Sequence, residues 1–170
     1  MARRPQDLLY LLTRAERLAV RRVQSVLDEF ECTVEAWRVL DLLSDGQGHN
    51  MTALADHAFL PAPSLTKLMD QLVDQNLVYR RVDPADRRRV LAHLTPRGKQ
   101  RWQLLAREVR SDWRDLEQLL AEGEELDHLL AGEELEHLLA RLAEALEGRP
   151  ATDPARVTTG RAGKAVGRAR

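Results

Sequence analysis

Three consecutive arginines, Arg87, Arg88 and Arg89, follow a turn-forming segment at residues 83–84. A guanidinium group donates several hydrogen bonds from one plane, and it pairs with phosphate or carboxylate oxygens in a bidentate manner. Asp86 stands two residues before Arg88, a spacing at which its carboxylate can hold an arginine by a bidentate pair. The pattern predicts a turn that presents guanidinium groups to a narrow, strongly negative groove such as the minor groove of DNA.

Small and hydroxyl-bearing residues begin an apolar-periodic segment that starts near residue 62. The first N–H groups of a helix lack partners within it, so a helix N-terminus favours phosphate. In a helix that lies in the major groove, residues near the N-terminus reach base edges, where Ser and Thr donate or accept and Lys adds charge. The residues expected to contact DNA here are Ala62, Pro63, Ser64, Thr66 and Lys67.

The charges lie in blocks, although the formal net charge of the chain is only -1. Residues 61–101 carry nine basic and four acidic side chains, and residues 102–148 carry four basic and thirteen acidic ones. A further six basic side chains and one acidic one follow in residues 149–170. A basic centre before an acidic segment suits a polyanion-binding face, and charge alone suits an ordinary solvated surface equally well.

Apolar periodicity predicts the elements that must position these residues. A long helix is expected from about residue 6 to 29 and a second one after the cap Thr33. A short third helix, from Met51 to about Ala58, follows the cap Asn50.

The pattern changes after a fourth helix that begins near Ala62 and ends where Asn76 adopts a left-handed conformation. Apolar residues then alternate over residues 78–82 and 90–94, which predicts a β-hairpin. Thr95-Pro96 begins a helix of about 25 residues by the cap-then-proline rule.

A nine-residue segment is duplicated in tandem, as GEELDHLLA at 123–131 and GEELEHLLA at 132–140. An uninterrupted helix would rotate by about two and a half turns between the copies and point their leucines in opposite directions. We therefore expect a break at a glycine. Residues 148–170 have no apolar period and are predicted to form a disordered basic tail.

The most specific motifs lie between Thr33 and Lys99: Leu54-Ala55, SLTKLMDQL at 64–72, Leu77-Val78, and DRRRVLAHLTPRGK at 86–99. These stretches resemble the MarR family of bacterial winged helix-turn-helix regulators, above all through the Asp-x-Arg and Leu-Thr-x-x-Gly patterns. The resemblance implies a homodimer in which the first helix and the last two interdigitate and two winged lobes bind a pseudo-palindrome. It also implies that Arg88 enters the minor groove and that Asp86 positions it.

The sequence departs from the family pattern at three positions and in the duplicated segment. Phe59 stands where the turn usually has glycine, Pro61 replaces a serine cap, and Asn76 replaces a glycine after the fourth helix. Asn is the best non-glycine residue for a left-handed position.

The predicted fold class is mostly α with a small β-hairpin, as a winged helix-turn-helix lobe plus a helical dimerisation region. The expected parts are an N-terminal dimerisation helix at 1–32, the DNA-binding lobe at 33–99, C-terminal dimerisation helices with the tandem repeat at 100–147, and the tail at 148–170.

Three further residues are candidates for a ligand or redox role. The resemblance implies a pocket for small aromatic or phenolic effectors beside the second helix. In that pocket Arg38 pairs with a carboxylate of the effector and Trp37 lines the wall; the alternative for Trp37 is a place in the core. Some members of the family sense peroxide, which makes Cys32 a redox candidate. It lacks a basic neighbour in sequence, so a buried structural cysteine is the alternative.

Other functional classes find no support in the sequence. His128 and His137 are copies of one repeat position, so their spacing does not indicate a metal site, and no cofactor is expected. No Gly-x-Ser-x-Gly, Walker or His-Glu-x-x-His motif indicates an enzyme. No apolar run is long enough for a membrane helix, and a cytoplasmic location is expected.

The sequence thus predicts a sequence-specific DNA-binding transcriptional regulator. The expected form is a ligand-responsive repressor, whose partners are double-stranded DNA and a second copy of the chain. The alternative is a helical protein-interaction module whose basic hairpin binds an acidic protein partner.

Overall fold

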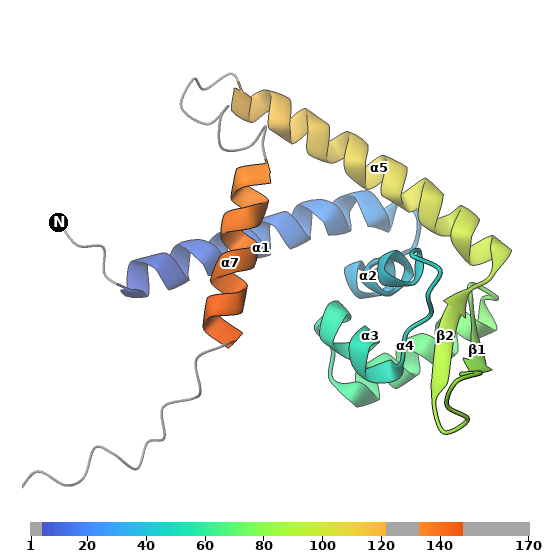
Figure 1. The fold of residues 1–170 in the computed structure, drawn as a ribbon. Helices are drawn as coiled ribbons and strands as arrows, with labels where there is room; N and C mark the ends of the chain where they lie inside the picture. Colours follow the sequence, from blue (N-terminus) through green and yellow to red (C-terminus); the bar gives the residue numbers. More distant parts are fainter. Residues whose placement is uncertain (1–4, 122–132, 148–170) are drawn as a thin grey trace, which may run out of the picture. The chain divides into compact units, whose positions relative to one another are not determined.

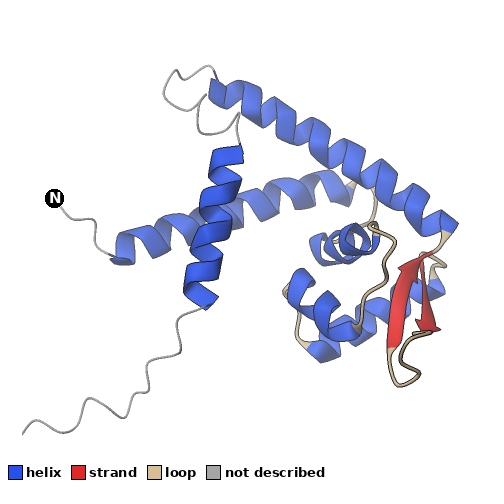
Figure 2. Cartoon of the chain, in the orientation of Figure 1, coloured by secondary structure: helices blue, strands red, loops and turns tan. Residues whose placement is uncertain are grey.

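The computed structural model describes residues 5–121 and 133–147, and the chain divides into two compact units, Met1–Gln118 and Leu119–Arg170. The elements are α1 (Pro5–Asp28), α2 (Val34–Leu43), α3 (Met51–Ala58), α4 (Ala62–Asp74), β1 (Val78–Val82), β2 (Val90–Leu94), α5 (Pro96–Ala121) and α7 (Glu133–Glu147) (Figure 1). Among the described residues, the fold is helical apart from one two-stranded sheet (Figure 2). The predicted fold class, mostly α with a small β-hairpin, is confirmed.

The helices α2 and α3 begin at the side-chain caps expected from the sequence. Thr33 Oγ1 accepts a hydrogen bond from the Ala36 N–H at 3.1 Å, and Asn50 Oδ1 accepts one from the Ala53 N–H at 2.9 Å. Each cap pairs one of the N–H groups that the first turn of a helix leaves without a partner.

A tight turn joins α3 to α4. Phe59 ends α3 in a left-handed conformation, with φ 56° and ψ 41°. Its N–H donates to Asp56 O at 3.2 Å, and the Leu60 N–H donates to Ala55 O at 3.0 Å. Pro61 then begins α4 from an extended conformation. The turn therefore forms even though it has a phenylalanine and a proline at the two departing positions.

The strands β1 and β2 form an antiparallel hairpin with the pairing Val78 to Leu94, Arg80 to Ala92 and Val82 to Val90. The loop after α2 is tied to this hairpin, because the His49 N–H donates to Ala92 O at 3.1 Å and the Ala92 N–H donates back to His49 O at 2.9 Å. The wing therefore has a fixed root on the rest of the lobe.

The Leu-Thr-x-x-Gly pattern connects the hairpin to α5. Thr95 Oγ1 donates to Asn76 O at 2.7 Å and accepts from the Gly98 N–H at 2.9 Å, while the Thr95 N–H donates to Leu77 O at 3.0 Å. A Cβ atom on Gly98 would lie 1.9 Å from Leu77 O, so this close approach requires glycine. Asn76 has φ 56°, the left-handed conformation expected for it.

One hydrophobic core joins α1 to the winged lobe and α5. Its largest fully buried side chains are Leu27, Leu40, Leu43, Leu54, Leu65, Met69 and Leu105. Burial of each such side chain stabilises the fold by roughly 1.5–3 kcal/mol. A bidentate ion pair adds a link between α1 and α5, with Arg22 Nε 2.6 Å from Asp112 Oδ2 and Arg22 Nη2 3.0 Å from Asp112 Oδ1.

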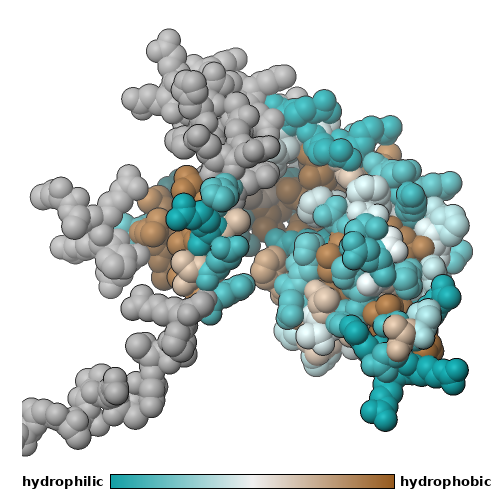
Figure 3. All heavy atoms as spheres, viewed as in Figure 1, coloured by the Kyte–Doolittle hydropathy of each residue, from teal (hydrophilic) through white to brown (hydrophobic). Residues whose placement is uncertain are grey.

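Apolar side chains are also exposed at the N-terminal end of α1, where Figure 3 shows them gathered. Leu9 is 67% exposed and Tyr10 is 63% exposed. In the second unit, Leu138 and Leu139 of α7 are exposed as well.

Most of the second repeat copy lies in α7. The first copy at 123–131, Gly132 with the expected break, and the tail at 148–170 lie outside the described residues. The predictions made for these segments stay predictions.

Candidate nucleic-acid interface and ligand cavity

The N-terminal turns of α4 present the side chains that the sequence singled out. Ala62, Pro63, Ser64, Thr66 and Lys67 are all exposed, whereas Leu65 and Met69 on the opposite face are buried in the core. Pro61 gives the helix no side-chain cap. The N–H groups of the first turn therefore keep their capacity to bind an anion.

The hydroxyl groups of this helix are not equivalent. Thr66 Oγ1 donates to Ala62 O at 2.9 Å, so its proton is directed back into the helix. A hydroxyl oxygen in this state still accepts hydrogen bonds. Ser64 has no such bond to another described residue, which leaves it as donor and acceptor.

Two aspartate-centred turns shape the tip of the wing. Asp83 Oδ1 accepts from the Ala85 N–H at 2.8 Å, and Asp86 Oδ1 accepts from the Arg88 N–H at 3.0 Å. The loop closes through the Asp83 N–H, which donates to Arg89 O at 2.9 Å. Figure 3 shows this end of the hairpin as hydrophilic surface.

The structure corrects the expected contact between Asp86 and Arg88. None of the ion pairs among the described residues joins the Asp86 carboxylate to a guanidinium group. An aspartate can accept a hydrogen bond from the backbone N–H two residues later, here that of Arg88. This bond gives the carboxylate a partner without using the flexible Arg88 side chain. Arg87, Arg88 and Arg89 are exposed. Asp86 therefore fixes the backbone at Arg88 and leaves the guanidinium group projecting.

The wing is also tied to the fourth helix, by a contact that the sequence did not predict. Arg80 of β1 places Nη2 2.7 Å from Asp70 Oδ1 of α4. Both side chains are substantially exposed, at 39% and 57%, so the pair adds little stability on its own. Its consequence is geometric, because it sets the hairpin against the helix that begins at Ala62.

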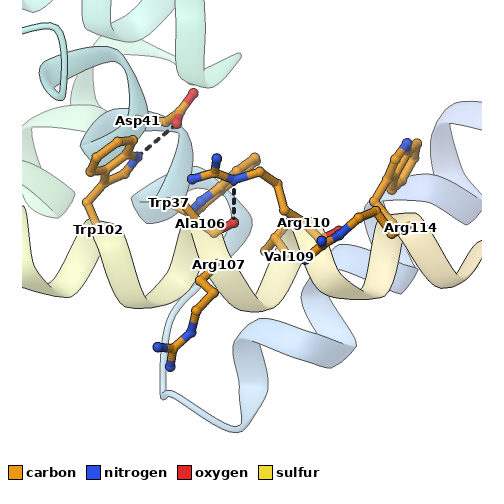
Figure 4. A pocket seen from close by; sticks show the side chains of 9 residues that line it. Trp37, Asp41, Trp102, Ala106, Arg107, Val109, Arg110 and Arg114 are labelled. Atoms are coloured by element: carbon orange, nitrogen blue, oxygen red, sulfur yellow. Dashed lines mark hydrogen bonds between the residues drawn. The ribbon is translucent and has the colours of Figure 1, made fainter.

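A cleft of about 820 Å³ lies between α2 and α5 (Figure 4). Its lining residues are Trp37, Asp41, Trp102, Ala106, Arg107, Val109, Arg110, Trp113 and Arg114. The Trp102 Nε1–H donates to Asp41 Oδ1 at 2.9 Å, and the Arg110 Nε–H donates to Ala106 O at 3.0 Å. The cleft thus combines indole rings with several guanidinium groups.

Trp37 is the polar group in this region that lacks a partner. Its Nε1–H is buried and makes no hydrogen bond within the described part of the chain. A buried donor without an acceptor costs about 1–3 kcal/mol, so a ligand oxygen placed there gains the difference. Trp37 also lines a second, apolar cavity of about 290 Å³, together with Arg38, Val109 and Trp113.

The sequence identified Trp37 and Arg38 but missed the residues of α5. Trp102, Ala106, Val109 and Trp113 are spaced by four, three and four, which places them on one face of a helix. That spacing was visible in the sequence, but its partner face on α2 was not. The structure brings Trp37 together with Val109 and Trp113.

Cys32 lies in a setting that disfavours thiolate chemistry. Burial raises the pKa of the Cys32 thiol to about 11, and the nearby positive charge of Arg101 lowers it only in part. The thiol is therefore almost fully protonated near neutral pH, which makes a peroxide-sensing role unattractive.

Among residues 5–121 and 133–147, no group of three or more His, Cys, Asp or Glu side chains is placed to hold a metal ion. His137 is exposed on α7, and His128 lies outside the described residues. No described helix combines the length and apolar character needed to cross a membrane.

Comparisons with known proteins agree with this geometry. The MarR family model matches residues 32–89. The transcriptional regulator FarR of Neisseria gonorrhoeae is 28% identical over 109 residues, which are 64% of this chain and 75% of that protein.

Two solved structures share the fold. NadR in complex with 4-hydroxyphenylacetate has a TM-score of 0.67 and 27% identity, covering 82% of this chain and 97% of NadR. The repressor CouR, bound to a 23-mer DNA duplex, has a TM-score of 0.65 and 27% identity, covering 80% and 92%. The MarR family model thus matches the winged lobe, and the chain is similar in sequence and fold to transcriptional regulators, including a repressor solved on DNA.

Proposed function

We propose that this protein is a transcriptional repressor that binds a pseudo-palindromic operator as a homodimer and releases it when a small aromatic acid binds. The observation that carries the proposal is the combination, on one lobe, of an uncapped, exposed α4 N-terminus with a wing tip held by aspartate turns. A fixed helix end and a fixed arginine loop suit the two adjacent grooves of B-DNA.

In this function, α4 enters the major groove and the wing enters the flanking minor groove. In this position Ser64 and Lys67 contact base edges or phosphates, and Ala62, Pro63 and Thr66 lie close to the DNA backbone. Arg88 enters the minor groove, where negative potential is greatest in narrow A·T-rich segments. Asp86 holds the Arg88 backbone in position through its 3.0 Å hydrogen bond.

The homodimer is supported by apolar surface that a single chain leaves uncovered. Leu8, Leu9, Tyr10 and Leu11 are consecutive and between 45% and 67% exposed. Consecutive residues point around a helix in all directions, so an exposed apolar run of this kind needs a partner surface. A two-fold dimer also matches the symmetry of a pseudo-palindromic operator. Sedimentation equilibrium should show a dimer, and a monomer at micromolar concentration would contradict this part.

The effector role is supported by the cleft between α2 and α5. An aromatic ring fits between indole side chains, and the unpartnered Trp37 Nε1–H can donate to a ligand oxygen. Trp37 also lines the smaller cavity, where Arg38 can pair with the carboxylate of the ligand. The similar protein NadR was solved with 4-hydroxyphenylacetate, an acid of this class. A ligand that binds one lobe arrangement more tightly shifts the population toward it and so lowers DNA affinity.

The test uses fluorescence anisotropy with a duplex obtained by sequence selection on the purified protein, repeated across salt concentrations. The Arg88→Ala variant should bind at least about fivefold more weakly and with a salt slope smaller by about 1 per wing. Arg107→Ala is the charge-matched control, because Arg107 lies on α5 with its side chain 70% exposed. It should bind the duplex as the wild type does.

Three results would contradict the proposal in different ways. Equal affinity of Arg88→Ala and wild type, with the dimer intact, would remove the wing assignment. Equal affinity for selected and scrambled duplexes would remove sequence-specific recognition. If poly-glutamate also competed as well as duplex DNA, the protein would instead be a helical interaction module that binds an acidic protein partner.

A further inference from the structure

Phe59 occupies a position that suits its residue type poorly. It has a left-handed backbone, which brings the Cβ of a bulky residue close to a carbonyl oxygen. Its side chain is 78% exposed, so burial in the core does not offset this conformation. The residue nevertheless ends α3 and directs the chain into α4, three residues before Ala62.

A charged side chain, Arg38 of α2, lies over the ring of Phe59. The guanidinium carbon lies 4.9 Å from the ring centroid, within the range of a cation–π interaction. None of the ion pairs among the described residues includes Arg38. Figure 1 shows α2 beside α3, and this contact joins α2 to the turn that precedes α4.

Arg38 also lines the smaller cavity beside Trp37. Among the eight residues that line this cavity of about 290 Å³, Arg38 carries the only charge. The others are apolar side chains of α1, α2 and α5, including Val34 and Trp113. The same arginine therefore borders this cavity and contacts the turn before α4.

We propose that Arg38 is the positioning residue through which an acidic ligand acts on α4. Without ligand, its guanidinium group lies over Phe59 and holds the turn. With a carboxylate in the cavity, the guanidinium group turns to a bidentate pair, which is stronger in a partly desolvated site than an exposed cation–π contact. This inference rests on the proposed function, and it identifies the regulated element as the turn from Phe59 to Pro61.

The turn is suited to transmit such a change. Its backbone hydrogen bonds, from Phe59 to Asp56 and from Leu60 to Ala55, link the ring position to the last turn of α3. Pro61 cannot continue that pattern, because it has no N–H to donate. A small shift at Phe59 therefore changes where α4 begins, and a packed element converts such shifts into a change between discrete arrangements.

The first experiment is a double-mutant cycle on duplex affinity without ligand, using the full chain. Phe59→Leu and Arg38→Gln should each weaken binding about two- to fivefold. The double variant should bind the duplex with the same affinity as the more weakly binding single variant, because both substitutions remove the same contact. Phe30→Leu is the matched control, since the Arg101 guanidinium carbon lies 6.0 Å from the centroid of the Phe30 ring. This second cation–π pair does not include the turn before α4. It should leave duplex affinity unchanged.

The second experiment measures binding of 4-hydroxyphenylacetate by calorimetry, with its neutral amide as the comparison. Arg38→Gln should bind the acid about tenfold more weakly, because a charged hydrogen-bonded pair is lost. Phe59→Leu should bind the acid two- to fivefold more tightly, because Arg38 no longer has to leave the ring. Binding of the amide should not change in either variant.

Phe59→Gly guards against a folding defect, because glycine adopts the left-handed conformation without strain. It should unfold at or above the wild-type temperature and show the same changes in duplex and acid binding as Phe59→Leu.

Additive single effects, or acid affinity unchanged in both Phe59 variants, would overturn the inference. If the wild type binds the duplex but not the acid, the Arg38 switch and the proposed effector are both wrong, while the DNA-binding part of the proposed function stands. If the wild type binds no selected duplex, the proposed function itself fails.

Discussion

Gly98 gives the sharpest test of how the wing is joined to α5. In Gly98→Ala the added Cβ would lie 1.9 Å from Leu77 O and 2.9 Å from Leu77 C, and both are backbone atoms. Carbon atoms in ordinary contact are about 3.5–4.0 Å apart, so the start of α5 must move away from Leu77 by more than about 1 Å. The same Leu77 O accepts the Thr95 N–H at 3.0 Å, so this hydrogen bond is weakened as well.

The expected loss follows from three contributions. Overpacking costs about 1–3 kcal/mol and a weakened hydrogen bond about 1 kcal/mol, while replacing glycine in a helix gains about 1 kcal/mol. The net loss in the free energy of unfolding is about 1–3 kcal/mol, which corresponds to a Tm lower by about 2–12 °C. Because the displaced residues support β2, the affinity for the selected duplex should also fall.

The assay is urea unfolding followed by circular dichroism, at one fixed protein concentration, together with duplex binding well below the Tm. Gly46→Ala is the matched control, since a Cβ there meets nothing within 4 Å and only its φ of +75° disfavours alanine. It should lose about 1 kcal/mol and keep its duplex affinity. Substitutions at neutral surface positions change the free energy of unfolding by up to roughly 0.5 kcal/mol. A change no larger than this in Gly98→Ala would refute the packing argument.

Three further predictions concern single residues. Asn50→Ala should lower the free energy of unfolding by about 1 kcal/mol in urea titrations, because the 2.9 Å cap to the Ala53 N–H is lost; no change would show that the cap is replaced by water. Asp86→Ala should weaken duplex binding several-fold with nearly unchanged Tm, whereas Asp83→Ala, which removes the other aspartate turn, should weaken it less; the reverse order would contradict the role of Asp86. The pKa of Cys32 is raised from 9.0 to about 11. The buried, protonated thiol therefore makes its full contribution to the free energy of unfolding below pH 9, and this contribution is lost as the pH rises through 11. Wild type should therefore lose up to about 2–3 kcal/mol more stability over this interval than Cys32→Ala, and parallel pH curves would argue against the raised pKa.

Much of the lobe could be predicted because its determinants are local. A cap such as Asn50 acts on an N–H three residues away, and the alternation on either side of the wing follows from the two-residue period of a strand. Asn76 lies at the end of α4 in the left-handed conformation that its position requires. The exposure of Ser64 and Lys67 follows in the same way, from the burial of Leu65 and Met69 on the other face.

Asp86 marks the limit of this local reasoning. The sequence placed it two residues before Arg88, and both a side-chain pair and a backbone turn are compatible with that spacing. The structure has the backbone turn. The choice depends on the whole loop, in which the Asp83 N–H also closes onto Arg89 O.

By itself, the sequence determined the order of the helices, the caps, the hairpin and the residues that the lobe exposes, because neighbours along the chain set these features. Only the tertiary structure decided that Arg80 pairs with Asp70, that Trp37 is left with an unpartnered N–H beside α5, and that Arg38 lies over Phe59. Such contacts join residues from different elements, and they depend on how the helices pack against one another. Periodicity identifies the face of a helix that will be buried, but it does not specify which side chain of another helix that face will meet.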